Sequence, residues 1–380
     1  MHEHFKGEGT HWRISKGLEM AVLEGISEGL EMAVLEGIKG RYLHSLKGRI
    51  QLYVLKLRSR RHYMANNTIG QTLSSFFLIG IPGLEEFHHW LSIPVFLLYS
   101  LSLMGNCLII LIIRLESSLH QPMYFFLCML ALNDLALSSS PAPKMLSIFW
   151  LDDHDTGFDT CLVQMYFIHT FSITESGLLV VMAFDRYVAI CQPLRYTTIL
   201  TNKLVVLMGL VASLRAAIMM FPCIVLIKHL TFCTKNIIQH TYCEHMAVVK
   251  LACSNAIINR IYGICVALSV VVLDTGLITM SYVRILQAVF RLSSSKARSK
   301  ALGTCAAHVC AILTFYVPSL FSFLTHRIDT KVSPSIHIIF ANIYLLVPPA
   351  VNPLVYGAKT KLIRDWVIFT LFSNKETVSK

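Results

Sequence analysis

Seven long runs of apolar residues follow one another along this chain, separated by short polar connections. A helix needs roughly 20 residues, at about 1.5 Å each, to cross a bilayer core of about 30 Å. A helix is the expected form, because backbone groups in lipid must pair within their own segment. The predicted spans are about Trp90–Ile113, Pro122–Trp150, Cys161–Cys191, Lys203–Ile227, Ala256–Phe290, Ala301–Leu324 and Ser335–Ala358. The pattern predicts an all-α membrane protein with a seven-transmembrane helix bundle.

The two ends of the chain follow other patterns. Gly17–Ile26 recurs word for word as Gly29–Ile38, and Glu and Gly interrupt both copies, which is typical of a disordered segment or one absent from the mature protein. We expect the working chain to begin at Met64. Lys359–Phe372 is amphipathic and predicts a short helix on the cytoplasmic membrane surface. The predicted divisions are an atypical extension (1–63), an extracellular tail (64–89), the seven-helix domain (90–372) and a cytoplasmic tail (373–380).

The charge distribution supports this assignment and predicts an orientation. Only 14% of the residues are charged, against roughly 25% in soluble domains. The net charge of +11 does not indicate nucleic-acid binding, because Lys and Arg lie between the apolar runs. They gather in the 1–2, 3–4 and 5–6 connections and after the last run, whereas the 2–3 connection is acidic. The positive-inside rule then places the N-terminus outside a plasma membrane and the C-terminus in the cytoplasm. Asn66, in Asn66-Asn67-Thr68, is a glycosylation acceptor on the outer side.

Four cysteines fall on the predicted outer side: Cys161, Cys233, Cys243 and Cys253. Outside the cell they should form two disulfides, and three connectivities are open. A competing interpretation is a metal site formed by His240, Cys243 and His245.

Ionisable residues inside the spans are costly and therefore point to a role. Asp134 and Glu175 lie in the middle of the second and third runs. Two facing carboxylates would share a proton or hold a cation; alternatively, one neutral acid is hydrogen-bonded in the core. Arg215 and Asp274, in the fourth and fifth runs, are predicted structural partners.

Short motifs in order along the chain carry a family resemblance. The chain reads M-A-F-D-R-Y-V-A-I-C over Met182–Cys191 and L-H-Q-P-M-Y-F-F-L over Leu119–Leu127. These stretches closely resemble olfactory receptors, a branch of the rhodopsin-like G-protein-coupled receptors. Ile81–Glu85 and Tyr242–Cys253 resemble the class I (fish-like) subgroup. The resemblance implies a small-molecule odorant, a heterotrimeric stimulatory G protein, a rise in cAMP and no enzymatic activity. No catalytic metal triad, phosphate-binding glycine loop or nucleophile elbow is present in the sequence.

The resemblance also assigns residues. It implies the disulfides Cys161–Cys243 and Cys233–Cys253, and a structural sodium ion at Asp134 and Glu175, with no other cofactor. The activation and coupling residues would be Asp185, Arg186, Tyr187, Tyr282, His308, Tyr316, Asn352, Pro353 and Tyr356. The ligand residues would be Arg327, His169, His245, Met220, Gly263, Ala267 and Phe323.

The charge of Arg327 favours a small carboxylic acid as ligand, because a buried carboxylate needs a cation. The alternative for Arg327 is a solvated charge paired with Asp329. Alternatives for the whole chain are a non-olfactory chemosensory receptor for a small metabolite acid, or a transporter or channel.

Overall fold

The computed structural model describes residues 74–233, 236–327, 333–359 and 364–365. The extension 1–63, the acceptor Asn66 and nearly all of the amphipathic segment 359–372 lie outside the described residues. The side chain of Arg327 also lies outside them, although its backbone ends a helix.

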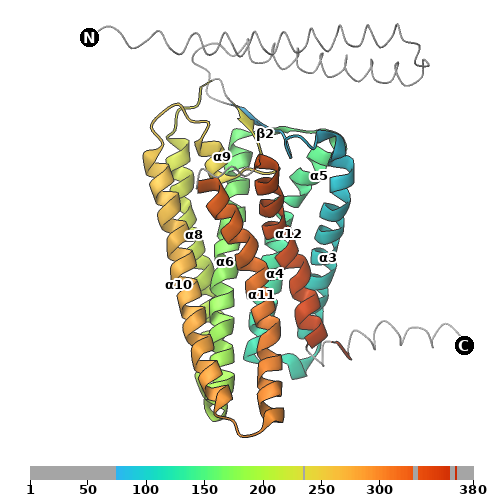
Figure 1. The fold of residues 1–380 in the computed structure, drawn as a ribbon, viewed down its shortest axis with the longest axis vertical. Coiled ribbons are helices and arrows are strands. Elements are labelled where there is room, and N and C mark those ends of the chain that lie inside the picture. The colour runs from blue at the N-terminus through green and yellow to red at the C-terminus, as the bar shows by residue number, and fades with distance from the viewer. Residues whose placement is uncertain (1–73, 234–235, 328–332, 360–363, 366–380) are drawn as a thin grey trace, which may run out of the picture. The chain divides into compact units, whose positions relative to one another are not determined.

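The described residues form seven helical segments that are long and apolar enough to cross a membrane, which confirms the predicted bundle (Figure 1). The long helices are α3 (His88–Leu115), α4 (Pro122–Ser139) with α5 (Ala142–Leu151), α6 (Phe158–Cys191), α8 (Asn202–Lys228), α10 (Ile257–Phe290), α11 (Ser295–Arg327) and α12 (Pro334–Lys359). Short helical turns connect them: η1 (Glu85–Phe87), η2 (Ser117–Leu119), η3 (Pro193–Arg195), α7 (Tyr196–Ile199) and α9 (His245–Val249).

The second predicted span, about 122–150, is present as Pro122–Leu151, but it is formed by two helices with a break between them. The chain leaves α4 at Ser139 and re-enters a helix only after Pro141. Proline has no N–H to donate and its ring clashes with the preceding turn, which interrupts the helical ladder. The Gln164 side chain of α6 donates to the Ser140 carbonyl at 3.1 Å and so satisfies one of the freed backbone groups.

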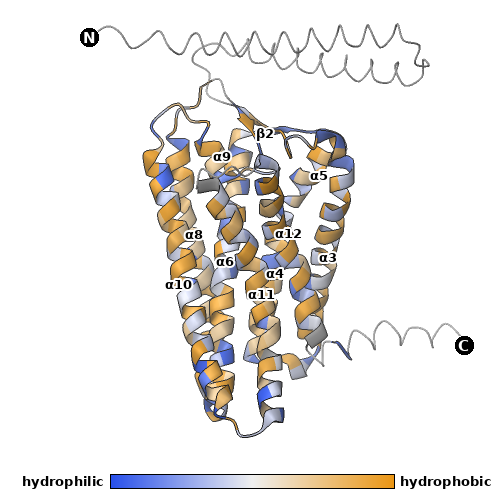
Figure 2. Ribbon diagram, viewed as in Figure 1, coloured by the Kyte–Doolittle hydropathy of each residue, from blue (hydrophilic) through white to orange (hydrophobic). Residues whose placement is uncertain are grey.

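α6 is the central helix of the bundle. It contacts α4, α8, α10 and α11. In its most apolar stretch 72% of the residues are buried by protein, against 11% in α10. α10 therefore turns most of its Leu, Ile and Val side chains outward, where lipid would cover them, and Figure 2 shows this apolar colouring along the outer helices.

Two glycines allow helices to approach closely. A Cβ on Gly105 of α3 would lie 2.7 Å from the ring of Pro353 in α12, and a Cβ on Gly177 of α6 would lie 2.9 Å from Ala212 in α8. Separations this short leave no room for a side chain, so glycine at both positions sets the spacing of the helix pairs.

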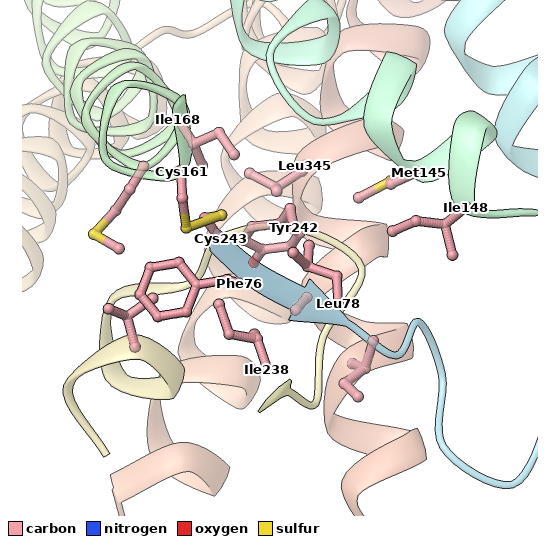
Figure 3. Packing of buried hydrophobic residues seen from close by; sticks show 14 of the residues in the cluster. Phe76, Leu78, Met145, Ile148, Cys161, Ile168, Ile238, Tyr242, Cys243 and Leu345 are labelled. Carbon is pink, nitrogen blue, oxygen red and sulfur yellow. A yellow bond between two sulfur atoms is a disulfide. The ribbon is translucent and has the colours of Figure 1, made fainter. Parts of the chain in front are cut away.

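A small sheet, which the sequence patterns did not predict, covers one end of the bundle. Its strands are β1 (Ser75–Leu78), β2 (Asp155–Gly157) and β3 (Ile237–Ile238), in the order β2-β1-β3. β1 pairs antiparallel with β2 and parallel with β3. Phe76 and Leu78 are fully buried on one face of β1, beside the Cys161–Cys243 disulfide and Tyr242 (Figure 3). The strand therefore belongs to the hydrophobic core at this end.

Candidate functional site

A cavity of about 200 Å³ lies between α6, α8, α10, α11 and α12, beneath the short helix α9. A cavity of roughly 150 Å³ is known to hold benzene, so this volume suits a molecule of comparable size. Six of the seven predicted ligand residues line it: His169, Met220, His245, Gly263, Ala267 and Phe323. The seventh, Arg327, has a side chain outside the described residues.

The lining of the cavity is polar in one part and apolar in another. His169, Glu244, His245 and His337 contribute polar groups, whereas the walls from α8 and α10 are mainly apolar, with Met220, Cys223, Val266 and Val270 among them. The Nε2 atom of His169 is buried and has no hydrogen-bond partner among the described residues. Such a lining matches a small amphiphile with one polar group.

Two of these lining residues were missed by the sequence analysis. His337 lies on α12, where its Nδ1 atom is 2.8 Å from the Thr325 hydroxyl of α11. Glu244 caps α9 by accepting a hydrogen bond of 2.6 Å from the Ala247 amide. Glu244 directly follows Cys243. The implied Cys161–Cys243 disulfide therefore could have placed Glu244 near the third span. Nothing in the local sequence marks His337.

Two disulfides hold the loop that covers the cavity. The Sγ atoms of Cys161 and Cys243 are 2.11 Å apart, and those of Cys233 and Cys253 are 2.07 Å apart, which is the pairing implied by the resemblance. Cys243 is therefore not available as a metal ligand, which contradicts the alternative metal site. Burial, with a smaller contribution from the Glu244 carboxylate, raises the pKa of the adjacent Tyr242 well above its usual value, so the phenol stays neutral.

Below the cavity, a chain of hydrogen bonds joins four helices. Tyr316 of α11 lines the cavity, and its hydroxyl lies 2.6 Å from the Ser176 hydroxyl of α6. Ser176 donates to Asp274 of α10 at 2.5 Å, and its only proton is then used, so Tyr316 must donate to Ser176. Asp274 also accepts two hydrogen bonds, of 2.6 and 2.7 Å, from Arg215 of α8. The predicted partnership of Arg215 and Asp274 is present.

At the other end of α6, Asp185 and Arg186 form a buried ion pair. The Arg186 Nε atom donates to Asp185 at 2.9 Å. The second oxygen of Asp185 accepts a hydrogen bond of 2.7 Å from Tyr196, a residue that the sequence analysis did not single out. Burial and the Asp185 carboxylate raise the pKa of Tyr196, which therefore remains a donor. Tyr187 packs beside Ile285 and Val289 of α10.

The remaining predicted activation residues lie on α10, α11 and α12. The Tyr282 hydroxyl of α10 is 3.0 Å from Nδ1 of His308 in α11. Tyr356 of α12 is buried, and its hydroxyl has no hydrogen-bond partner among the described residues. The ring of Pro353, about one turn earlier in α12, packs closely against α3 at Gly105. These side chains thus lie where α10 meets α11 and where α12 meets α3.

Comparison with known proteins decides the family. The family model described as olfactory receptor matches residues 95–375, about three quarters of the chain. The chain belongs to the olfactory receptor family. Human olfactory receptor 52P1 is 55% identical over 78% of this chain and 92% of that receptor. Human olfactory receptor 52K1 is 52% identical over 79% and 95%, and mouse olfactory receptor 51E2 is 48% identical over 78% and 93%.

These similarities confirm the class I assignment and give the receptor its general function. It is a multi-pass, G-protein-coupled olfactory receptor and not an enzyme. Its partners are therefore odorant molecules and a G protein. The alternative of a transporter or channel was wrong.

The receptor also holds two buried acids between α4, α6 and α12. Asp134 is 0% exposed and Glu175 is 1% exposed, and the two interact electrostatically. Asn352 donates to one oxygen of Asp134 at 3.0 Å. The other oxygen of Asp134 and one oxygen of Glu175 have no hydrogen-bond partner among the described residues. Buried unpaired oxygens of this kind are suited to a proton or a small hard cation.

Proposed function

We propose that this olfactory receptor binds a small odorant in the cavity and activates a stimulatory G protein, which raises cAMP. The observation that supports this most is the position of Tyr316. Its side chain lines the cavity and starts the hydrogen-bond chain to Ser176, Asp274 and Arg215. A ligand that displaces Tyr316 therefore acts on four helices at once, and packed helices of this kind change between discrete arrangements.

The proposed orientation has the N-terminus outside the plasma membrane. Arg291 follows α10, and Lys296 and Arg298 lie in the first turn of α11, whereas the connection before α6 carries Asp152, Asp153 and Asp155. Positive charge is retained on the cytoplasmic side during insertion. The cavity then opens toward the extracellular end, and the Asp185–Arg186 pair lies at the cytoplasmic end.

The proposed ligand class is a small aliphatic carboxylic acid. The polar and apolar lining suits a head group and a short carbon chain. Arg327, at the end of α11, supplies the positive charge, and the unpaired Nε2 of His169 supplies a hydrogen bond. Glu244 lines the same cavity, so a carboxylate must bind at a distance from it.

The test is a cAMP assay in cells that express the receptor, with an aliphatic acid series and the alcohols of matching chain length. Ala267→Phe should abolish the response because the larger side chain fills the cavity. Val211→Phe on α8 is the matched control, since Val211 is 56% exposed on the outer face of the bundle. Equal responses of both variants would exclude this cavity as the odorant site.

Two single substitutions should have opposite effects on an acid. Arg327→Ala removes the proposed counter-charge, and we expect acid potency to fall by at least about tenfold, because a charge-assisted hydrogen bond contributes roughly 1.5–3 kcal/mol. Glu244→Gln removes a repelling carboxylate and keeps an oxygen for the cap of α9, so acid potency should rise. Dose–response curves at equal surface expression measure both shifts. Unchanged acid potency in Arg327→Ala would contradict the acid assignment and leave the cavity test unaffected.

Asp185→Asn should raise cAMP in the absence of odorant. The substitution weakens the ionic hold on Arg186, which is then available to the G protein. Tyr196→Phe is the matched control, because it removes only the neutral hydrogen bond to Asp185 and should have a smaller effect. Basal cAMP, normalised to surface receptor, is the measurement. A flat basal level in Asp185→Asn would show that this pair does not restrain the receptor.

We also propose that Asp134 and Glu175 hold a structural sodium ion. Their unpaired oxygens fit a hard cation that prefers oxygen ligands. An ion there would neutralise one carboxylate charge and join α4 to α6. Replacing sodium by choline should change basal G-protein activation in membranes containing the receptor, and the same exchange should have no effect on Asp134→Asn. No sodium dependence in the parent receptor would indicate a shared proton instead, and equal dependence in both would show that sodium acts at another place.

A further inference from the structure

A second cavity, of about 510 Å³, lies between α10 and α11 near the turn that joins them. We call it the α10–α11 groove. Its lining includes Tyr282, Ile285 and Leu286 from α10, and Leu302, Val309 and Leu313 from α11. It shares no residue with the odorant cavity.

The groove opens on the outer face of the bundle and not toward its interior. Leu286, Leu302, Val309 and Leu313 are 37–55% exposed, whereas Ile285 at its base is fully buried. Its lining is almost entirely apolar. On the outer face of a membrane-spanning bundle, such a groove faces the hydrocarbon of the lipid and not water.

The length of the groove is close to the thickness of the hydrocarbon layer of one leaflet. Leu302 to Leu313 spans about 17 Å along α11 at about 1.5 Å per residue. Half of a bilayer core of about 30 Å is about 15 Å. A single acyl chain lying along the groove would therefore end near the middle of the membrane.

The chemistry changes at the end of the groove near the α10–α11 turn. Arg298 lies one helical turn before Leu302, on the same face of α11. Its Nε atom is buried and has no hydrogen-bond partner among the described residues. Residues 275–327 contain no Asp or Glu, so no carboxylate in this part of the sequence balances Arg298 or its neighbours Arg291 and Lys296.

We propose that the α10–α11 groove binds one acyl chain of an anionic phospholipid, with the phosphate of its head group against Arg298. The lipid comes from the leaflet on the side of the α10–α11 turn, which is the cytoplasmic leaflet in the proposed orientation and the one rich in anionic lipids. The bound chain contacts Tyr282, whose hydroxyl pairs with His308 of α11. The lipid is therefore positioned to influence the separation of α10 and α11.

The test is native mass spectrometry of the purified full-length receptor, equilibrated with phosphatidylserine and phosphatidylcholine of identical acyl chains. Ala306→Trp fills the groove from α11, and Leu210→Trp on the outer face of α8 is its matched control. Arg298→Gln removes the proposed head-group contact. Arg195→Gln is the control for loss of one exposed charge on the same side of the membrane.

We expect the parent, Leu210→Trp and Arg195→Gln to retain phosphatidylserine in preference to phosphatidylcholine. In Arg298→Gln the preference for phosphatidylserine should fall about fivefold. This is the equivalent of about 1 kcal/mol for one basic residue near a membrane surface. Ala306→Trp should lose the retained lipid itself. A photoreactive acyl chain on phosphatidylserine should label peptides from α10 and α11. Equal lipid retention by all variants, or equal labelling of α8, would overturn the proposal. Neither outcome depends on odorant response or on G-protein coupling.

Discussion

Asp274→Asn is expected to prevent most of the receptor from reaching the cell surface. The substitution leaves the guanidinium of Arg215, whose side chain is 33% exposed, without its carboxylate. Removing one partner of a buried ion pair typically costs 3–5 kcal/mol, and an unpaired charge within the bilayer is also costly. The Ser176 hydroxyl loses a charged acceptor at the same time. The surface fraction of an epitope-tagged receptor, measured by flow cytometry, gives the result.

The chain offers a matched control for this prediction. Asp159 forms an ion pair of 3.1 Å with Lys228, and both side chains are more than half exposed. Exposed pairs contribute about 0–1 kcal/mol, so Asp159→Asn should leave surface delivery nearly unchanged. The double variant Arg215→Met with Asp274→Leu should recover much of the delivery, because no charge remains unpaired. If Asp274→Asn behaved like Asp159→Asn, the pair would not be a structural requirement.

Cys161→Ser or Cys243→Ser should also block delivery to the surface, and more strongly than loss of the second disulfide. Both cysteines are fully buried in the core that contains Phe76. Their bond closes a separation of 82 residues, against 20 for Cys233 and Cys253. In the chain-entropy account this difference favours the first bond by about 1.2 kcal/mol, within a usual range of about 2–5 kcal/mol for a native disulfide.

The comparison needs a cysteine whose loss breaks no bond. Cys107 on α3 is free and exposed, so Cys107→Ser is the control for cysteine removal as such. Surface fraction and ligand response should rank Cys107→Ser first, Cys233→Ser second and Cys161→Ser last. Normal delivery of Cys161→Ser would show that the loop stays over the cavity without its bridge.

The sequence predicted the spans well because bilayer thickness sets the length of each apolar run. The ends of α8 and α12 lie within about one residue of the predicted ends, within the usual uncertainty of helix boundaries. The break at Pro141 was missed because the apolar run continues through it. β1 was missed because a strand of four residues has its partners elsewhere in the chain, at Thr156 and Ile238.

Some residues of the candidate site could likewise be predicted from the sequence, and others could not. The six lining residues came from the resemblance to a family, and local pattern alone would not have placed Gly263 or Ala267 in a cavity. His337 and Tyr196 were missed because their roles depend on contacts with distant residues, Thr325 and Asp185. The hydrophobic periodicity of the sequence indicates which face of a helix is apolar, but it does not indicate which helices contact one another.

The small sheet has a consequence for biosynthesis. Leu78 of β1 pairs with Ile238 of β3, 160 residues later in the chain. At about 5–20 residues per second, the ribosome takes roughly 8–32 seconds to make that interval. During this time four membrane spans are made, and the side chains of Phe76 and Leu78 lack the part of their core that Ile238, Tyr242 and Cys243 supply. In the proposed orientation, a nascent receptor therefore presents a short apolar strand in the lumen of the endoplasmic reticulum, where a chaperone that recognises extended apolar segments would bind it until β3 is made.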